Sequence, residues 1–214
     1  MRYQLLVLDH DDTVVKSMEQ LHYPSMLHTL AQLRPDVRMT ADEYKELCAD
    51  PGFEPYCRQV LGLSDEEMAF ELADWQAFTA GRIPDAFEGM KEALCAFKAA
   101  GGKIGVVTHS SRALVERDYA HHFGFVPDAV LDLTFTPQKP DPAPVQALLT
   151  RFALPPAAAL AVDDLPPGLH MAAAAGVDFA YAAWGKPAPS VDRVMRANAP
   201  LVLETVADLQ RVIL

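Results

Sequence analysis

Short apolar runs alternate with segments of helical periodicity over most of the chain, and this alternation limits the fold more than any other feature. The strand-like runs lie at Leu5–Leu8, 103–109, 129–133, 160–164 and 178–185. The helical patterns between them lie at Phe87–Ala100, Arg112–Phe123, Ala143–Phe152 and Leu169–Ala175. Continuously apolar strands separated by helices are typical of a parallel sheet covered on both faces. We therefore predict an α/β fold with a parallel sheet and helices on both faces.

Residues 17–83 differ from the rest because they contain no strong strand pattern and have apolar residues at helical spacing. Thr40 and Ser64 are each followed three residues later by glutamate, which predicts a capping box at two helix starts. We expect Trp75 and Phe78 to pack inside this helical segment. The chain is thus predicted to consist of a core, residues 1–16 with 84–214, and a helical insertion, residues 17–83.

Composition excludes several classes of protein. The chain has 214 residues and a formal net charge of −11, which argues against a surface that follows nucleic-acid phosphates. Its three cysteines, Cys48, Cys57 and Cys95, form no CxxC pair and predict neither a disulfide framework nor a zinc site. We find no signal peptide and no apolar segment long enough for a membrane span. We expect a cytoplasmic protein, monomeric or homodimeric, with no nucleic-acid or membrane partner.

Polar side chains follow four of the predicted strands. Asp9, Asp11 and Asp12 follow the first, Thr108 and His109 the second, Lys139 lies in the loop after the third, and Asp163 and Asp164 end the fourth. Ligands of parallel sheets bind beyond the carboxyl ends of the strands, so these groups should meet at one edge. Carboxylates from two strands suit Mg²⁺, lysine and hydroxyl groups suit phosphate, and one aspartate remains as a possible nucleophile.

Four stretches at these strand ends resemble the motifs of the haloacid dehalogenase-like hydrolase superfamily. "DHDDTVV" is similar to its DxDx[TV] motif, "VVTHSSR" to its second motif, "KPDPAP" to its KPxP motif, and "VDDLPPGLHMAAAAG" to its fourth. The form of the fourth motif resembles the branch of phosphoglycolate phosphatase and beta-phosphoglucomutase. The resemblance implies a Rossmann-like core with a helical cap inserted after the first motif.

The resemblance also implies roles for individual residues. Asp9 would be the nucleophile and Asp11 the acid/base. Mg²⁺ would be bound by Asp9, the carbonyl of Asp11, and Asp164, with Asp163 as a ligand or an outer partner of the site. The phosphate would be held by Thr108 and Lys139, and by His109 if that side chain takes part. The implied activity is Mg²⁺-dependent hydrolysis of a small phosphorylated metabolite through an aspartyl-phosphate.

Several points stay open at this stage. A phosphomutase of the beta-phosphoglucomutase type, or less plausibly a non-catalytic binding protein, would share the fold. Asp12 stands where the family has glycine, His10 where it has an apolar residue, His109 where it has asparagine, and Lys16 where it often has aspartate. Candidates for substrate specificity are His22, Tyr23 and Arg112, together with the cap residues Phe53, Glu54 and Tyr56.

Overall fold

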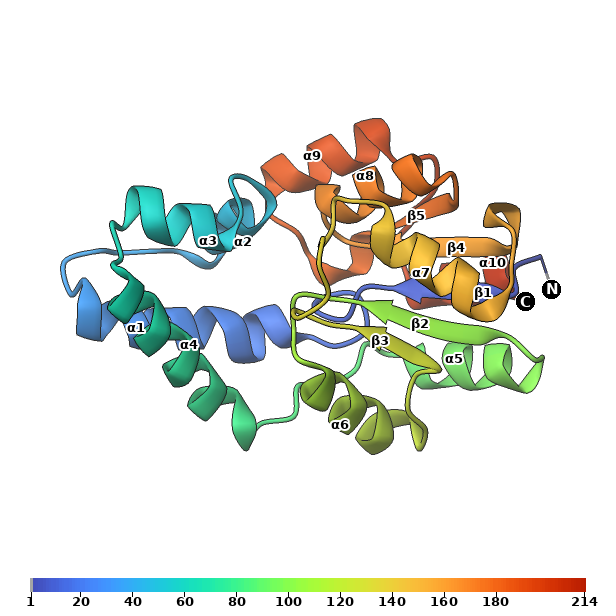
Figure 1. Cartoon of the computed structure of the whole chain (residues 1–214), viewed down its shortest axis with the longest axis horizontal. Helices are drawn as coiled ribbons and strands as arrows, with labels where there is room; N and C mark the ends of the chain where they lie inside the picture. The colour runs from blue at the N-terminus through green and yellow to red at the C-terminus, as the bar shows by residue number, and fades with distance from the viewer. Residues whose placement is uncertain (1) are drawn as a thin grey trace.

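A six-stranded parallel sheet forms the larger lobe of the molecule (Figure 1). A computed structural model of the chain describes residues 2–214. The strand order is β3-β2-β1-β4-β5-β6, so β1 lies at the centre between β2 and β4. The bounds are β1 Leu5–Leu8, β2 Lys103–Val107, β3 Ala129–Leu131, β4 Ala159–Asp163, β5 Asp178–Ala182 and β6 Val202–Leu203. The predicted parallel α/β fold with helices on both faces is confirmed.

Alternating side chains of β1 pack into two separate hydrophobic cores. Leu6 and Leu8 face one core, which is closed by α5 (Met90–Ala99), α6 (Arg112–Phe123) and α10 (Val206–Ile213). Leu5 and Val7 face the other core, which is closed by α7 (Ala143–Phe152), α8 (Pro166–Ala175) and α9 (Pro189–Asn198). Because side chains of a strand point to opposite faces in turn, a central strand must be apolar throughout. Burial on both faces therefore explains why "LLVL" contains no polar residue.

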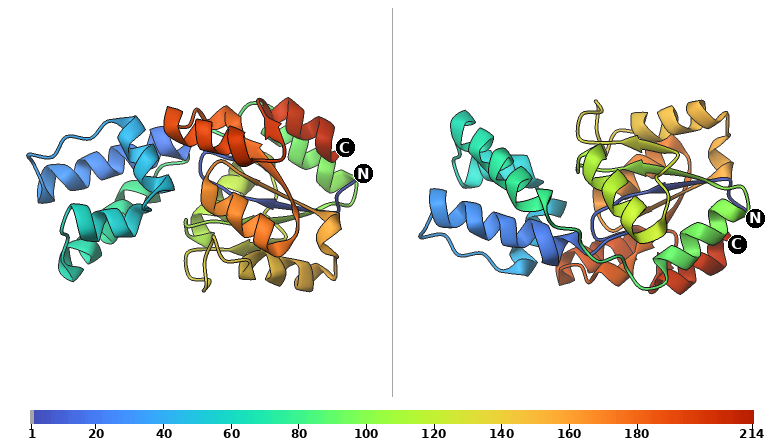
Figure 2. Two further views of the ribbon diagram at one scale, coloured as in Figure 1. Left: turned by 90° about the horizontal axis from the view of Figure 1, so that it is seen from above. Right: turned by 90° about the horizontal axis from the view of Figure 1, so that it is seen from below.

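Helices alone form the smaller lobe, residues 18–80, which we call the helical lobe (Figures 1 and 2). Its segments are η1 Met18–His22, α1 Tyr23–Leu33, α2 Ala41–Ala49, α3 Phe53–Pro55, η2 Tyr56–Val60 and α4 Asp65–Ala80. Both predicted capping boxes are present, at Thr40 before α2 and at Ser64 before α4. A third core, which includes Met26, Leu30 and Tyr44, holds these helices together. No helix within residues 2–214 combines the length and apolar character that a membrane span requires.

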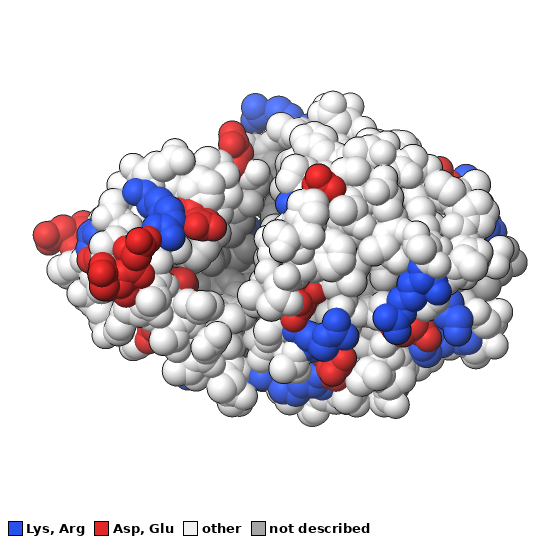
Figure 3. All heavy atoms as spheres, in the orientation of Figure 1, with Lys and Arg blue, Asp and Glu red and all other residues white. Residues whose placement is uncertain are grey.

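Two chain segments join the lobes and pair with each other. Val15 forms an antiparallel bridge with Ala86, and the Lys16 amide donates to the Asp85 carbonyl at 2.8 Å. The first segment leads directly from β1, so the residues after that strand lie between the sheet and the helical lobe. The surface is hollowed between the two lobes (Figure 3).

Candidate active site

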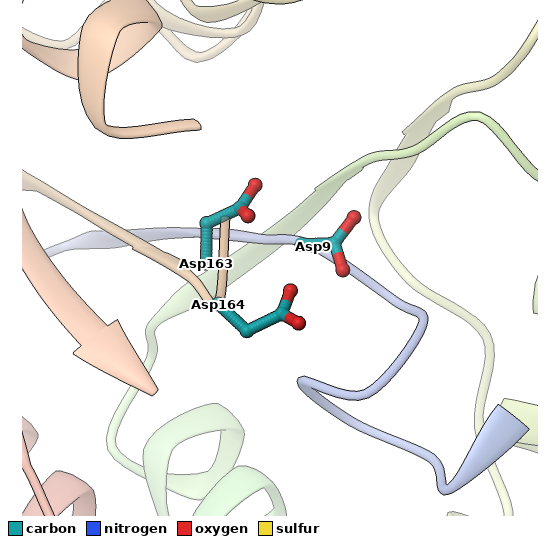
Figure 4. Close-up of side chains that lie close together, drawn as sticks. All are labelled: Asp9, Asp163 and Asp164. Carbon is teal, nitrogen blue, oxygen red and sulfur yellow. The ribbon is translucent and has the colours of Figure 1, made fainter. Parts of the chain in front are cut away.

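Three buried carboxylates meet at the carboxyl ends of β1 and β4. Asp9 follows β1, whereas Asp163 ends β4 and Asp164 follows it, and one oxygen of each lies within 4.8 Å of the others. The side chains of Asp9 and Asp164 extend to the same side, so that their carboxylates lie next to each other (Figure 4). The two strands are direct neighbours in register, with Leu8 opposite Val162, which brings residues some 150 positions apart into one cluster. The structure thus brings together the carboxylates that the sequence placed at these two strand ends.

Lys139 supplies the positive charge inside this cluster. Its Nζ donates to Asp9 Oδ1 at 2.6 Å and to Asp163 Oδ2 at 2.7 Å, and its side chain is 7 % exposed. The other Asp163 oxygen accepts from the Leu165 amide at 2.9 Å, so both oxygens of Asp163 are engaged. Asp9 Oδ2 accepts no hydrogen bond from residues 2–214. Asp9 therefore keeps one oxygen free for an incoming group while Lys139 holds the other.

One lysine does not balance three carboxylates. Burial raises the pKa of Asp9 to about 7 even though Lys139 lowers it. Burial and the charges of Asp163 and Asp9 raise the pKa of Asp164 well above its ordinary value. Carboxylates that are destabilised in this way gain from a bound divalent cation, and a set of hard oxygen donors fits Mg²⁺.

Gly168 allows Asp163 to occupy its position. A Cβ at Gly168, in the first turn of α8, would lie 2.2 Å from the carboxyl carbon of Asp163. The Asp163 side chain cannot move aside, because Lys139 and the Leu165 amide hold its two oxygens. The glycine in "DDLPPGLH" is therefore required for close approach of α8 to the charged cluster.

Asp11 is held by groups from both lobes. From the larger lobe, which contains the sheet and which we call the sheet lobe, Ser110 Oγ donates to Asp11 Oδ2 at 2.7 Å. Thr108 Oγ1 donates to the same oxygen at 3.3 Å. From the helical lobe, His22 Nε2 lies 2.8 Å from Asp11 Oδ1. Burial raises the pKa of the Asp11 carboxyl, but the neighbouring His22 outweighs it, so the pKa lies well below its usual range. Asp11 is thus ionised in this arrangement.

Trp75 fixes the orientation of His22. The indole Nε1 of Trp75 donates to His22 Nδ1 at 3.1 Å, and this bond turns Nε2 toward Asp11. This contact lies within the helical lobe, where we expected Trp75 to pack, and the hydrogen bond to His22 is the detail that the expectation did not include. Helix periodicity identifies the face on which Trp75 lies, but it does not identify the side chain of η1 that this face meets. Ser110 also follows the second predicted strand, but it was given no role, because "THSS" offers three hydroxyl groups at one strand end.

Asp12 adopts the backbone conformation that its place in the motif requires. Its φ is 55°, in the left-handed region where the family has glycine and where aspartate is among the better tolerated residues. Its carboxylate accepts from the Met18 amide at 3.0 Å and so stabilises the start of η1. The Asp12 carbonyl lies against Gly185, where an added Cβ would be only 2.6 Å away. Asp12 therefore has the backbone conformation that we expected from the glycine of the family motif. The absence of a side chain at Gly185 leaves room for the Asp12 carbonyl.

The remaining predicted residues make other contacts. His109 is exposed and lines a small cavity of about 10 Å³ next to Thr108 and Lys139. Tyr23 donates to the Met39 carbonyl at 2.9 Å within the helical lobe. The Arg112 guanidinium donates to the Val130 carbonyl and lies 3.7 Å from Glu116. In residues 2–214 no hydrogen bond joins these three side chains to the carboxylate cluster, and their roles in substrate binding stay predictions.

Lys45 and Glu46 of α2 connect the helical lobe to the sheet lobe near the site. Lys45 Nζ donates to the Lys186 carbonyl at 2.7 Å, and Ser190 donates to the Glu46 carboxylate. Lys45 is 7 % exposed although it carries a charge. These contacts place α2 against the loop that follows β5 and against the start of α9.

Glu71 is a buried carboxylate on the face of α4 that carries Trp75 one turn later. It is 8 % exposed and has no hydrogen-bond partner within residues 2–214. Burial raises its pKa from 4.5 to about 7. Its ionised form is therefore disfavoured in the folded protein and readily accommodated in the unfolded chain.

Glu71→Gln is expected to stabilise the protein at high pH. The cost of ionising Glu71 is absent below its unfolded pKa of 4.5, grows as pH rises, and is complete above the folded value of about 7. The melting temperature of the variant should therefore exceed that of the wild type at about pH 8 and approach it at about pH 4. Glu88→Gln, at an exposed position, is the control and should show no such pH-dependent gain. An equal gain at both pH values would contradict the assignment of a buried charge.

Comparison with known proteins agrees with this arrangement. The family profile described as haloacid dehalogenase-like hydrolase matches residues 6–182, which includes β1 to β5 and the helical lobe. A search of curated proteins returned no match.

Several solved structures share the fold over nearly the whole chain. A predicted phosphoglycolate phosphatase from Haemophilus somnus 129PT is 19% identical with a TM-score of 0.82, and the match covers 100% of this chain and 99% of that one. CbbY from Rhodobacter sphaeroides, solved as a variant in complex with xylulose-(1,5)bisphosphate, is 22% identical with a TM-score of 0.77, covering 97% and 96%. A predicted phosphatase from Clostridium acetobutylicum is 14% identical with a TM-score of 0.80, covering 100% and 99%. The family match spans most of the chain and the strand-end cluster has the expected residues, so the protein belongs to the haloacid dehalogenase-like hydrolases.

Proposed function

We propose that the protein is a Mg²⁺-dependent phosphatase that hydrolyses a small phosphate monoester through an aspartyl-phosphate on Asp9. The observation that carries this proposal is the buried cluster of Asp9, Asp163 and Asp164 with Lys139. A phosphoryl group needs a positioned nucleophile and neutralisation of its negative charge, and both are available here. The solved relatives described as phosphatases support the same class of substrate.

Asp9, Asp164 and the carbonyl of Asp11 would hold the metal ion. Asp163 serves better as the partner of Lys139, because both its oxygens are already engaged. When bound, Mg²⁺ would offset the charge of the carboxylates and of the phosphate oxygens. Of the two roles considered for Asp163, we therefore favour that of an outer partner of the site over that of a direct metal ligand.

The first half of the reaction transfers the phosphoryl group to Asp9. The free Oδ2 of Asp9 attacks phosphorus, and the bond to the leaving oxygen breaks. Lys139 stays against Asp9 Oδ1, and its positive charge offsets the negative charge of the neighbouring phosphoryl oxygens. Asp11 gives a proton to the leaving oxygen, for which it must first be protonated. That proton comes from solvent, because His22 accepts from the Trp75 indole at Nδ1 and its one proton, on Nε2, holds Asp11 by a hydrogen bond.

The second half returns Asp9 to its starting state. Asp11, ionised after the first step, accepts a proton from water, and the resulting hydroxide attacks phosphorus. The bond between phosphorus and Asp9 Oδ2 breaks, so that inorganic phosphate leaves and the Asp9 carboxylate is restored. Thr108 and Ser110 hold Asp11 on the side of the sheet lobe. The hydroxyl of Thr108 would bind the phosphate once the substrate displaces it from Asp11. Closure of the helical lobe, acting as a cap over residues 1–16 and 84–214, would exclude bulk water.

A phosphomutase would share the first half of this reaction and pass the phosphoryl group to a sugar hydroxyl. The observation that favours keeping this alternative is the fold shared with CbbY, whose structure holds a sugar bisphosphate. Product analysis with a hexose phosphate and a bisphosphate primer separates the two. Isomerised sugar phosphate as the main product would identify a mutase, and free inorganic phosphate a phosphatase.

Removal of divalent metal should abolish turnover. We expect a purified preparation to release inorganic phosphate from members of a panel of small phosphate monoesters, such as phosphoglycolate and sugar phosphates, in the presence of Mg²⁺. EDTA should stop the release, and excess Mg²⁺ should restore it. Without substrate, Mg²⁺ should raise the melting temperature of the wild type more than that of Asp164→Asn, since the ion relieves repulsion among buried carboxylates. No turnover with Mg²⁺ across the panel would refute the proposed function.

A further inference from the structure

His10 occupies an unusual environment for a residue that lies between Asp9 and Asp11. Its side chain is 2 % exposed, and its Nε2 lies 3.2 Å from Asp118 Oδ2 on α6. His10 Nδ1 is buried and has no hydrogen-bond partner within residues 2–214. An apolar side chain would fill this place without burying an unpaired nitrogen, which is costly. The contact with Asp118 is therefore the feature that distinguishes histidine from an apolar residue here.

Asp118 connects His10 to Arg117. Asp118 is 2 % exposed and uses both its oxygens, since Oδ2 contacts His10 and Oδ1 accepts from Arg117 Nε at 2.8 Å. A buried carboxylate that is satisfied by two partners is held in one position, and removing either partner leaves part of its charge uncompensated.

Arg117 in turn binds the end of the helical lobe. Its guanidinium donates to the Thr79 carbonyl at 3.0 Å and to the Ala80 carbonyl at 3.4 Å. These carbonyls belong to the last residues of α4, where backbone acceptors lack partners within the helix and a positive charge is favourable. Gly81 and the second segment between the lobes follow immediately. Arg117 therefore fixes the point at which the chain leaves the helical lobe.

We propose that His10, Asp118 and Arg117 form a buried connection, the α6 link, that couples the position of the helical lobe to the geometry of the loop bearing Asp9 and Asp11. The link connects the loop that carries Asp9 with the end of α4. It passes through Asp118 and Arg117, which are adjacent residues of α6. The three side chains are positioning residues, since none of them contacts the carboxylate cluster. Movement of α4 that breaks the Arg117 contacts also alters the partner of His10. The part of the proposal that concerns turnover rests on the proposed function, and the structural coupling does not.

Hydrogen exchange of backbone amides tests the coupling without any substrate. Arg117→Met should accelerate exchange in residues 9–15, although Arg117 makes no contact with that loop. His10→Leu should reciprocally accelerate exchange at the end of α4, around residues 79–82. For couplings of the usual size we expect changes of about 2- to 30-fold. In the double variant the exchange rate of each segment should rise no more than in the single variants, because either substitution alone already interrupts the connection.

Matched variants separate coupling from general loosening. His122 of α6 donates to the Pro84 carbonyl in the same segment between the lobes but does not contact Asp118. His122→Gln should therefore loosen residues 84–86 without affecting residues 9–15. His10→Gln retains an N–H group within reach of Asp118 and should restore slow exchange that His10→Leu loses. Additive effects in the double variant, or changes confined to the mutated site, would overturn the proposal.

Kinetics provides a second readout in the Mg²⁺-loaded protein. Arg117→Met and His10→Leu should lower kcat for a phosphate monoester by similar factors, with little change in KM. His10→Gln should recover most of that loss. If the wild type hydrolyses no phosphate monoester, the proposed function fails while the exchange experiment still decides the coupling. If turnover is normal and exchange shows no coupling, the α6 link alone is refuted.

Discussion

Asp9→Asn is expected to reduce turnover of a phosphate monoester by at least about 10³-fold, because the amide oxygen is a poor nucleophile. The substitution keeps the shape of the side chain and an acceptor for Lys139, so the fold should persist. The rate of phosphate release measured under substrate saturation checks this directly. Binding of inorganic phosphate in the presence of Mg²⁺, measured by calorimetry, should survive and show that the site is still formed.

Asp12→Asn is the matched control for this experiment. Asp12 is a buried aspartate in the same loop, but its carboxylate accepts from the Met18 amide and lies outside the carboxylate cluster. Asparagine tolerates the left-handed conformation that this position requires. The variant should retain activity within about tenfold of the wild type, as expected for a side chain that does not react. Equal losses in Asp9→Asn and Asp12→Asn would show that the loop responds as a whole and would contradict the role of Asp9.

Lys139→Met is expected to destabilise the metal-free protein by about 3–5 kcal/mol, the usual result of removing one partner from a buried ion cluster. Lys139 is buried between Asp9 and Asp163, at 2.6 and 2.7 Å, and methionine has similar length but no charge. The deficit should be larger at about pH 8 than at about pH 5. Loss of the lysine raises the folded pKa of Asp9 further above its unfolded value of 3.8, so ionisation opposes folding increasingly as pH rises. Urea unfolding at the two pH values measures the effect.

Lys103→Met is the control for Lys139. Lys103 is half exposed and lies 3.8 Å from Asp128, so its removal should cost less than about 1 kcal/mol at either pH. A similarly small loss of unfolding free energy for Lys139→Met would contradict the prediction. It would show that the buried carboxylates are protonated in the wild type, so that Lys139 has no negative charge to offset. Mg²⁺ should recover part of the stability of Lys139→Met if the ion binds the same carboxylates.

The central part of the fold could be predicted from the sequence because its signals are local. The apolar run Leu5–Leu8 must be buried on both faces, and the capping boxes at Thr40 and Ser64 depend on residues only three positions apart. Helices α6 and α7 have the predicted bounds for the same reason. β6 was not predicted, because two residues give no periodicity.

The strand-end groups could also be predicted, since parallel topology brings consecutive strand ends to one edge. What the sequence did not show are the contacts between side chains of elements that are distant in the chain. Trp75 and His22 meet because α4 packs against η1, and Arg117 reaches Thr79 only in the folded chain. His10 was unexplained by the motif, and its partner Asp118 is 108 residues away. Such contacts depend on the relative position of elements that no local pattern encodes.

Trapping of a phosphorylated enzyme shows whether Asp9 takes the phosphoryl group. Enzyme and substrate are mixed with Mg²⁺, quenched in acid during the first turnover, digested and analysed by mass spectrometry. We predict that the peptide containing Asp9 gains the mass of one phosphoryl group, that hydroxylamine removes it, and that Asp9→Asn shows none. Product release in the first turnover with Asp9 unmodified throughout, or a phosphoryl group on another side chain, would contradict this prediction.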